Sequence, residues 1–160
     1  MADQEQLLMQ AKSVYETFCS ALDDEEWHYT RHDEDLTITC GAKGHDLAMD
    51  FFVIIDAERQ IISVLSPMPF KMSEEKRVDG SLVVNVANYG MTSGSFDYDL
   101  SDGEIRFRMT NSFRGSIIGK ELCLAMLYTV AATTDRYNDK FLAVSTGIMS
   151  VEQFLEWEKQ

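Results

Sequence analysis

The sequence lacks three features that would each point to a class of protein. It has 14 basic residues against 27 acidic ones, a net charge of -13, which repels nucleic acids and anionic lipid surfaces. It has no apolar run near the roughly 18 residues that a membrane-spanning helix needs. Its N-terminus lacks the basic and then apolar pattern of a secretory signal. We therefore expect a cytoplasmic protein that binds neither nucleic acid nor a membrane.

Cysteine is also scarce. Cys19, Cys40 and Cys123 are odd in number, far apart and set in apolar patterns, which predicts reduced core thiols. None of them has an evident histidine partner, and no serine lies in a nucleophile elbow. His28 and His32 flank an acidic turn without a third ligand at a recognisable spacing, which favours surface histidines over a metal site. The sequence thus predicts no catalytic, cofactor-binding or metal-binding residue, and no cofactor.

The residues that are present fit one domain. The 160 residues, 45% of them hydrophobic, suffice for a single well-buried core, and no linker or repeat divides them. Helical periodicity predicts helices over residues 3–22, 73–90 and 118–137, and a last one beginning at Ser150 with the spacing of a capping box.

Extended segments account for much of the remainder. They are predicted at residues 27–31, 36–40, 47–55 and 61–65. The third of these is apolar on both alternating faces, which predicts a central strand. The fourth is expected to end at Pro67 and Pro69, because proline cannot donate a ladder hydrogen bond.

The second helix has a clear apolar stripe. Its members fall at i, i+4, i+8 and i+11: Val78, Leu82, Val86 and Tyr89. This spacing predicts that the stripe faces the core. Ser73 can cap the start of the helix, and Gly90 can close its end in a left-handed conformation. Asn85 lies near the middle of the stripe and is either an amide bonded to neighbouring backbone or a polar anchor in a ligand pocket.

A hairpin follows Gly94. Apolar and charged residues alternate on both sides of the turn at Asp102-Gly103: Phe96, Tyr98 and Leu100 with Asp97 and Asp99, then Ile105, Phe107 and Met109 with Arg106 and Arg108. We expect the opposite charges to pair across the strands as a solvated salt-bridge face and not as a catalytic pair.

Two sets of residues are candidates for protein interaction. One is a small apolar group beside the prolines: Met68, Phe70 and Met72. The other belongs to the long helix, which is apolar on both sides and must be covered on both: Leu124, Leu127 and Tyr128. The cover is either the C-terminal helix or a second subunit, and because that helix offers few apolar side chains, we expect a homodimer.

The most recognisable part of the sequence runs from the second helix into the hairpin. It reads Leu82-Val-Val-Asn85-Val-Ala-Asn88-Tyr89, then Gly94-Ser-Phe96-Asp97-Tyr98-Asp99, then Asp102-Gly103-Glu104-Ile105-Arg106-Phe107, and the helix from Ile118 follows. With the order of elements, these residues resemble the YbjN family of bacterial proteins over roughly residues 27–137. The resemblance implies a fold similar to that of type III secretion chaperones, which are small acidic dimers that hold extended client segments, and it implies a regulator without catalytic residues.

The sequence therefore predicts a single YbjN-like α+β domain over residues 1–160, with an antiparallel sheet flanked by helices. The predicted function is a noncatalytic protein-binding or regulatory module, a homodimer with a protein client. The alternative is a small-ligand-binding protein or an enzyme with a pocket near Asn85 and Tyr89. A deep pocket with converging polar groups and perturbed titratable residues would favour the alternative, and a broad apolar surface would favour the module.

Overall fold

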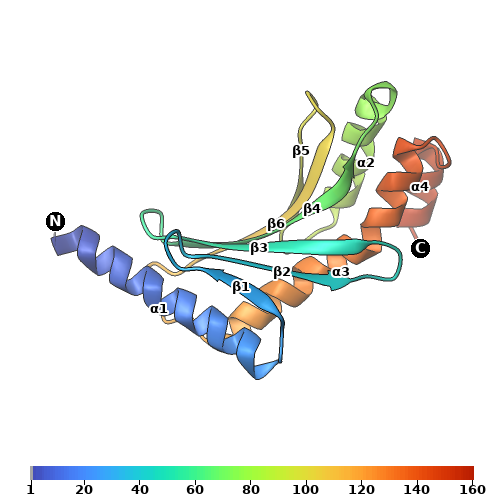
Figure 1. The fold of residues 1–160 in the computed structure, drawn as a ribbon. Coiled ribbons are helices and arrows are strands. Elements are labelled where there is room, and N and C mark those ends of the chain that lie inside the picture. The colour runs from blue at the N-terminus through green and yellow to red at the C-terminus, as the bar shows by residue number, and fades with distance from the viewer. Residues whose placement is uncertain (1) are drawn as a thin grey trace.

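The computed structural model describes residues 2–160, which form helices and strands in the order shown in Figure 1. The helices of this part of the chain are α1 (Ala2–Asp24), α2 (Arg77–Tyr89), α3 (Lys120–Ser145) and α4 (Val151–Glu158), with a short 3-10 turn, η1 (Glu74–Lys76), before α2. The strands are β1 (Tyr29–His32), β2 (Thr37–Lys43), β3 (Ala48–Asp56), β4 (Ile61–Lys71), β5 (Ser95–Tyr98) and β6 (Glu104–Ser112). None of the helices within residues 2–160 is long and apolar enough to cross a membrane.

The strands form one sheet in the order β1-β2-β3-β4-β6-β5, and every neighbouring pair is antiparallel. This confirms the predicted α+β class and places β3 inside the sheet. Figure 1 shows that the sheet curves and that the helices pack on its convex side, with α1 and α3 below β3 and with α2 and α4 beside the rising ends of β4 and β5. The concave side of the sheet bears no helix of the described chain.

The core lies between the convex side of the sheet and the helices. Alternate residues of β3 are buried there, as the two-residue period of a strand requires. The intervening Phe52 and Ile54 are 36% exposed, so only one side of β3 is covered. The apolar run over residues 47–55 therefore predicted an interior strand correctly. Its apolar residues on both faces do not mean that both faces are buried.

The fourth strand does not stop at the prolines. β4 continues to Lys71, and both Pro67 and Pro69 lie within it, which corrects the predicted end at these residues. The pairing of β4 with β3 ends at Leu65, and its register with β6 shifts between Pro67 and Lys71. Proline is tolerated there because β4 has lost one neighbour and the ladder is already interrupted.

The second helix turns the opposite face to the core from the predicted one. Its buried residues are Gly80, Val83, Val84 and Ala87. A Cβ atom on Gly80 would lie 2.6 Å from the Tyr98 hydroxyl oxygen and 2.8 Å from Met72 Cγ, so α2 approaches its neighbours most closely on the face with the smallest side chains. The predicted inner stripe points outward instead.

The expected caps of α2 are also absent. Ser73 makes no capping hydrogen bond, and its hydroxyl donates to the Ser145 carbonyl oxygen at 3.0 Å. Gly90 has a φ of -98°, so the helix ends without the left-handed residue that the sequence suggested. The capping box of α4 is confirmed, because Ser150 Oγ accepts from the Gln153 N–H and Gln153 Oε1 accepts from the Ser150 N–H.

Candidate protein-interaction surface

The first predicted interaction group is largely internal. Met68 and Met72 are buried in the core, whereas Phe70 is half-buried. The prediction of an exposed group is wrong for both methionines. Because β4 extends past the prolines, Met68 takes an inward position of the strand, and Met72 is enclosed by Gly80 and Gly103. Phe70 stays a candidate contact residue.

The second group, on α3, is largely covered within the chain. Leu127 is fully buried, Leu124 is half-buried, and Tyr128 is 44% exposed. The Tyr128 ring lies 6.3 Å from the Trp27 ring, and its hydroxyl donates to Glu25 at 3.5 Å. The expectation that Leu127 needs a second subunit is thus wrong, because its own chain seals it. Leu124 and Tyr128 stay predictions as contact residues.

The outer face of α2 carries three exposed apolar side chains in a row. Val78 is 67% exposed, Leu82 49% and Tyr89 92%, while Val86 is half-buried. Leu155 of α4 lies beside them at 36% exposure. We call these five residues, Val78, Leu82, Val86, Tyr89 and Leu155, the α2–α4 face.

A groove with a volume of about 310 Å³ lies between α2 and α4. Its walls are Asn85, Val86, Tyr89, Gly90, Leu155, Glu158 and Lys159. Asn85 lines the groove and is exposed, so the predicted burial of the stripe around it is wrong, while its role as a polar anchor in a pocket stays a prediction. The groove does lie where the alternative function placed a pocket.

The α2 side of the α2–α4 face is unusual in its charge. Residues 80–94 contain no charged side chain, whereas 26% of the whole chain is charged and its net charge is -13. An exposed, uncharged and apolar helix face on so acidic a chain is a candidate contact surface, because soluble domains rarely leave such residues grouped in water. Sequence periodicity identified the stripe itself but assigned it to the interior.

Two polar contacts fix α2 on the sheet with this face outward. Asn88 Nδ2 donates to the Phe96 carbonyl oxygen at 2.9 Å, and the Phe96 N–H donates to Asn88 Oδ1 at 2.7 Å. The Tyr98 hydroxyl donates to the Arg77 carbonyl oxygen at 2.7 Å. Sequence reasoning missed the role of Asn88 because it took the opposite side of α2 as buried and therefore considered Asn85.

An aromatic cluster supports the α4 side of the groove. Phe154 stacks on Phe141 of α3 with ring centroids 5.7 Å apart, and Trp157 meets Tyr137 of α3 edge-on at 5.3 Å. The Tyr137 hydroxyl donates to Glu158 Oε1 at 2.8 Å. Burial, and then this hydrogen bond, raise the pKa of Tyr137 to about 12. Glu158 is thereby held at the end of the groove.

The remaining reactive groups are scattered. The three cysteines are free, as predicted, and burial raises the pKa of Cys40 and of Cys123 to about 11, away from the thiolate form that a nucleophile needs. His45 pairs through Nδ1 with Asp135 of α3, and His32 Nε2 lies 3.1 Å from Thr39 Oγ1. Within residues 2–160, His, Cys, Asp and Glu side chains form no group of three or more that could hold a metal ion.

The predicted salt-bridge face of the hairpin is present in part. Asp97 accepts from Arg108 Nε at 2.8 Å and from Arg106 Nε at 3.1 Å. Asp99 instead turns into the β5–β6 connection, where it accepts from the Ser101 N–H at 2.8 Å. β5 ends at Tyr98 and β6 begins at Glu104, so the connection is longer than a two-residue turn at Asp102-Gly103, and only Gly103 of that pair has a positive φ, 81°.

Comparison with solved structures extends the description of the fold. The crystal structure of YbjN from E. coli matches with a TM-score of 0.61 and 9% identity, covering 83% of this chain and 92% of that one. The structure of the HopA1-SchA chaperone-effector complex contains a chain that matches with a TM-score of 0.54 and 8% identity, covering 82% of this chain and 97% of that one. At these identities the likeness concerns the fold alone, which is thus similar to that of a chain in a chaperone-effector complex.

Comparison with protein families assigns the chain to a family, although comparison with curated proteins finds no match. Among curated proteins, no sequence matches this chain. The family described as "YbjN: Putative bacterial sensory transduction regulator" matches residues 15–143, which is most of the chain and includes α2, the hairpin and nearly all of α3. The chain therefore belongs to the YbjN family.

Proposed function

We propose that this protein is a noncatalytic, cytoplasmic protein-binding module with a regulatory role, and that it works as a homodimer joined through the α2–α4 face. The observation that carries the proposal is the uncharged stripe of Val78, Leu82 and Tyr89, exposed on a chain of net charge -13. Family membership supports a regulatory role, and the likeness to a chaperone-effector complex supports a protein client.

A second copy suits this face for an electrostatic reason. Two chains of charge -13 repel each other over most of their surfaces, and the repulsion is weakest where neither carries a charge. Residues 80–94 meet that condition, and a stripe packed against its own copy around a two-fold axis forms a self-complementary contact.

The gain from covering this face is large enough to matter. Complete burial of an exposed Val or Leu side chain contributes about 1.5–3 kcal/mol, and Val78, Leu82 and Tyr89 would each be buried twice in a symmetric dimer. Tyr89, 92% exposed, can keep its hydroxyl at the wet rim while its ring is covered. These contributions must exceed the free-energy cost of association, which is why the proposal needs the whole stripe and not one residue.

Photo-crosslinking tests the proposed interface. A photoreactive phenylalanine derivative replaces Tyr89 in one protein and Ile117 in a control, because Ile117 is also apolar and is 100% exposed but lies before α3. The proposal predicts a covalent dimer from position 89 and none from position 117. Equal crosslinking at both positions, or no protein adduct at position 89, would contradict it.

A second candidate function is the binding of a small apolar ligand in the groove between α2 and α4. The 310 Å³ groove lined by Asn85, Val86 and Tyr89 favours it, since apolar walls with a few polar groups are usual for such sites. Native mass spectrometry of the purified protein separates the two functions. A retained mass of a few hundred daltons that is lost in a Val86→Asp variant would support the ligand, and a dimer mass without such an adduct would support the module.

A further inference from the structure

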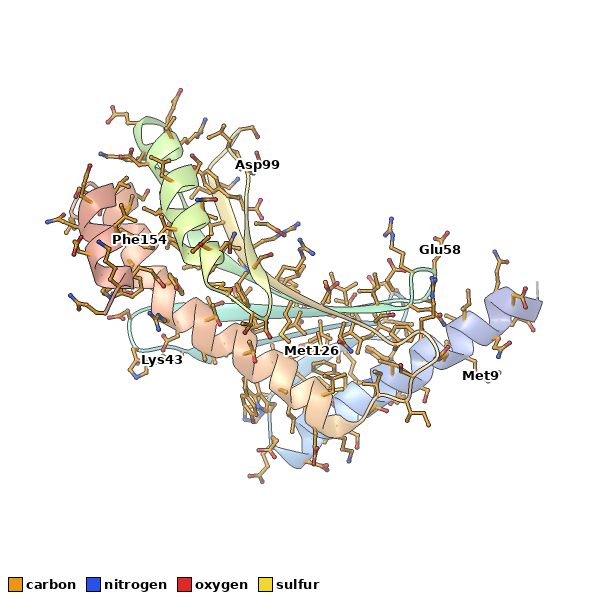
Figure 2. All side chains as sticks on the ribbon, turned by 180° about the vertical axis from the view of Figure 1, so that it is seen from behind. Met9, Lys43, Glu58, Asp99, Met126 and Phe154 are labelled. Atoms are coloured by element: carbon orange, nitrogen blue, oxygen red, sulfur yellow. The ribbon has the colours of Figure 1, made fainter. Side chains whose placement is uncertain are left out.

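The concave side of the sheet is a second surface that the described chain leaves uncovered. Figure 2 shows it between two connections, the β5–β6 turn marked by Asp99 and the β3–β4 turn marked by Glu58, with Met126 of α3 on the opposite side. Residues that pair directly across antiparallel strands point to the same side. The strand register therefore identifies the residues that line this concave surface.

One row of paired residues crosses nearly the whole sheet. Phe52 pairs with Thr39 on one side and with Leu65 on the other, Leu65 pairs with Arg108, and Arg108 pairs with Ser95. Phe52 is 36% exposed and Leu65 is half-buried, whereas their strand neighbours Phe51 and Val64 are buried against the helices. The row therefore lies on the concave side.

Neighbouring rows extend this surface in both directions. Ile54, also 36% exposed, pairs with Ser63, and Ser63 pairs with Thr110. On the other side of the row, Pro67 pairs with Arg106, which pairs with Asp97. An apolar area centred on Phe52, Ile54 and Leu65 thus adjoins a cluster of two arginines and one aspartate.

Most N–H donors of the arginine cluster are not used in its hydrogen bonds to Asp97. Arg108 donates to Asp97 from Nε at 2.8 Å and from Nη2 at 3.0 Å, and Arg106 donates from Nε at 3.1 Å. These are three of the ten N–H groups that two guanidinium groups carry. Arg106 and Arg108 are 44% and 40% exposed, so several donors face solvent beside the apolar area.

The charge of this cluster is opposite to that of the chain. Two guanidinium groups share one carboxylate, whereas the whole chain carries -13. The other acidic residues on this side are Asp50 and Asp56 of β3, two and four residues from Phe52, and Glu104 and Asp99, which line a hollow with Asp97 and Arg106. An acidic group on a partner would meet repulsion at these carboxylates, so its most favourable position is beside Arg108, the cation that adjoins the apolar area, with Arg106 as the second donor.

The geometry points to the concave side as the docking surface for an extended segment of a partner protein that carries alternating apolar residues and one acidic residue. Its apolar side chains cover Phe52, Ile54 and Leu65, and its carboxylate accepts hydrogen bonds from Arg106 and Arg108. This inference rests on the proposed protein-binding function and names the chemistry of the client, which docks on a surface separate from the α2–α4 face.

Three fluorescent nonapeptides test the surface. They alternate valine and serine from valine at both ends, and they differ only at the central position, which is glutamate, glutamine or lysine, on the same side as the valines. We expect the glutamate peptide to bind about tenfold more tightly than the lysine peptide, because a charge-assisted hydrogen bond contributes about a factor of ten. Its amide chemical-shift changes should be confined to β3, β4 and β6.

Substitutions on the concave surface are expected to change peptide affinity in opposite directions. Arg106→Gln with Arg108→Gln should remove the preference for glutamate, and Phe52→Ser should weaken all three peptides alike. Asp97→Asn should strengthen binding of the glutamate peptide several-fold, because the internal carboxylate no longer occupies the guanidinium groups. This gain is the most discriminating result, since a general loss of structure cannot produce it. Thermal unfolding of each variant confirms that it is folded.

Several outcomes would overturn the inference. They are equal binding of the glutamate and lysine peptides, no binding of any peptide, shift changes on the α2–α4 face, and no gain from Asp97→Asn. Binding of anionic phospholipid vesicles in place of the peptides would also contradict it. Leu82→Asp, which targets the proposed dimer, should leave peptide affinity unchanged, so the docking surface and the dimer can fail independently.

Discussion

Helices α2 and α3 are both apolar on two sides, yet the structure treats them differently. α3 is enclosed by its own chain, with Leu127 fully buried and aromatic residues of α4 stacked on its C-terminal half. α2 buries only Gly80, Val83, Val84 and Ala87, and it leaves Val78, Leu82 and Tyr89 in water. An apolar pattern on two sides of a helix therefore shows that two covers are needed, but not that the same chain supplies both.

The difference follows from where each helix lies. α3 contacts α1, α4 and several strands, so its neighbours surround it, as Figure 1 also shows. α2 lies at the end of the molecule, between β5 and α4, with one side open. If the outer side of α2 is a contact surface, substitutions there should affect association, whereas matched substitutions on α3 should affect folding.

The largest expected effect separates the two helices directly. Leu127→Asp places an unpaired carboxylate in the core, so the free energy of unfolding should fall by about 3–5 kcal/mol. Leu82→Asp places the same group on an exposed position, so the unfolding of the monomer should change by less than about 1 kcal/mol. Urea unfolding at one low protein concentration measures both. A Leu127→Asp protein as stable as the wild type would show that α3 is not sealed.

A smaller effect tests how α2 is held. Asn88→Ala removes both hydrogen bonds to the Phe96 backbone and leaves a buried N–H and C=O unpaired, which should cost about 1–3 kcal/mol. Asn85→Ala, on the exposed side three residues earlier, is the matched control and should change stability by less than about 0.5 kcal/mol. Thermal or urea unfolding gives the comparison, and equal effects of the two variants would mean that the Asn88 contacts do not hold the helix.

The hairpin beside α2 should respond to acid. Hydrogen bonds from Arg108, and next from Arg106, lower the pKa of Asp97 in the folded protein. Its contribution to stability is therefore present above the unfolded pKa of about 3.9 and is lost as the pH falls through the lower folded value. Asp97→Asn should reduce stability at pH 7 by up to about 1 kcal/mol, and the difference from the wild type should vanish at low pH. A difference that stays constant from pH 7 to pH 2 would disprove this linkage.

The smallest expected effect concerns the β2–β3 turn, where His45 contacts α3. The hydrogen bond to Asp135 raises the pKa of His45, so its stabilising contribution is present below the unfolded value near 6.5 and is lost as the pH rises through the folded value. An NMR titration should show the His45 pKa falling toward its ordinary value in Asp135→Asn. An unchanged titration would mean that the contact with α3 does not persist in solution.

Local patterns were enough to predict much of the fold. The apolar period of residues 3–22 gave α1, the spacing of Ser150 and Gln153 gave the cap of α4, and the alternation around Asp102-Gly103 gave the hairpin. Each of these features depends on residues close together in the sequence, where propensity and hydrogen bonding act directly.

The features that sequence reasoning missed depend on distant contacts. β4 continues past Pro67 because β6 still pairs with it, and α2 turns its small face inward because Gly80 meets Tyr98 and Met72. Helical period shows which residues share a face, but it does not show which face is covered. The small residues Gly80 and Ala87 indicated which face of α2 packs closely on its neighbours. The larger apolar residues on the opposite face led to the wrong prediction.

Sedimentation equilibrium at micromolar concentration tests most directly whether a second copy covers the outer face of α2. The measurement compares the wild type with Leu82→Asp and with the control Ile117→Asp, whose residue is equally apolar and fully exposed but lies outside the α2–α4 face. The account predicts a dimer of about twice the 18.2 kDa chain mass for the wild type and for Ile117→Asp, and a folded monomer for Leu82→Asp. A wild-type monomer, or a dimer that persists in Leu82→Asp, would contradict it.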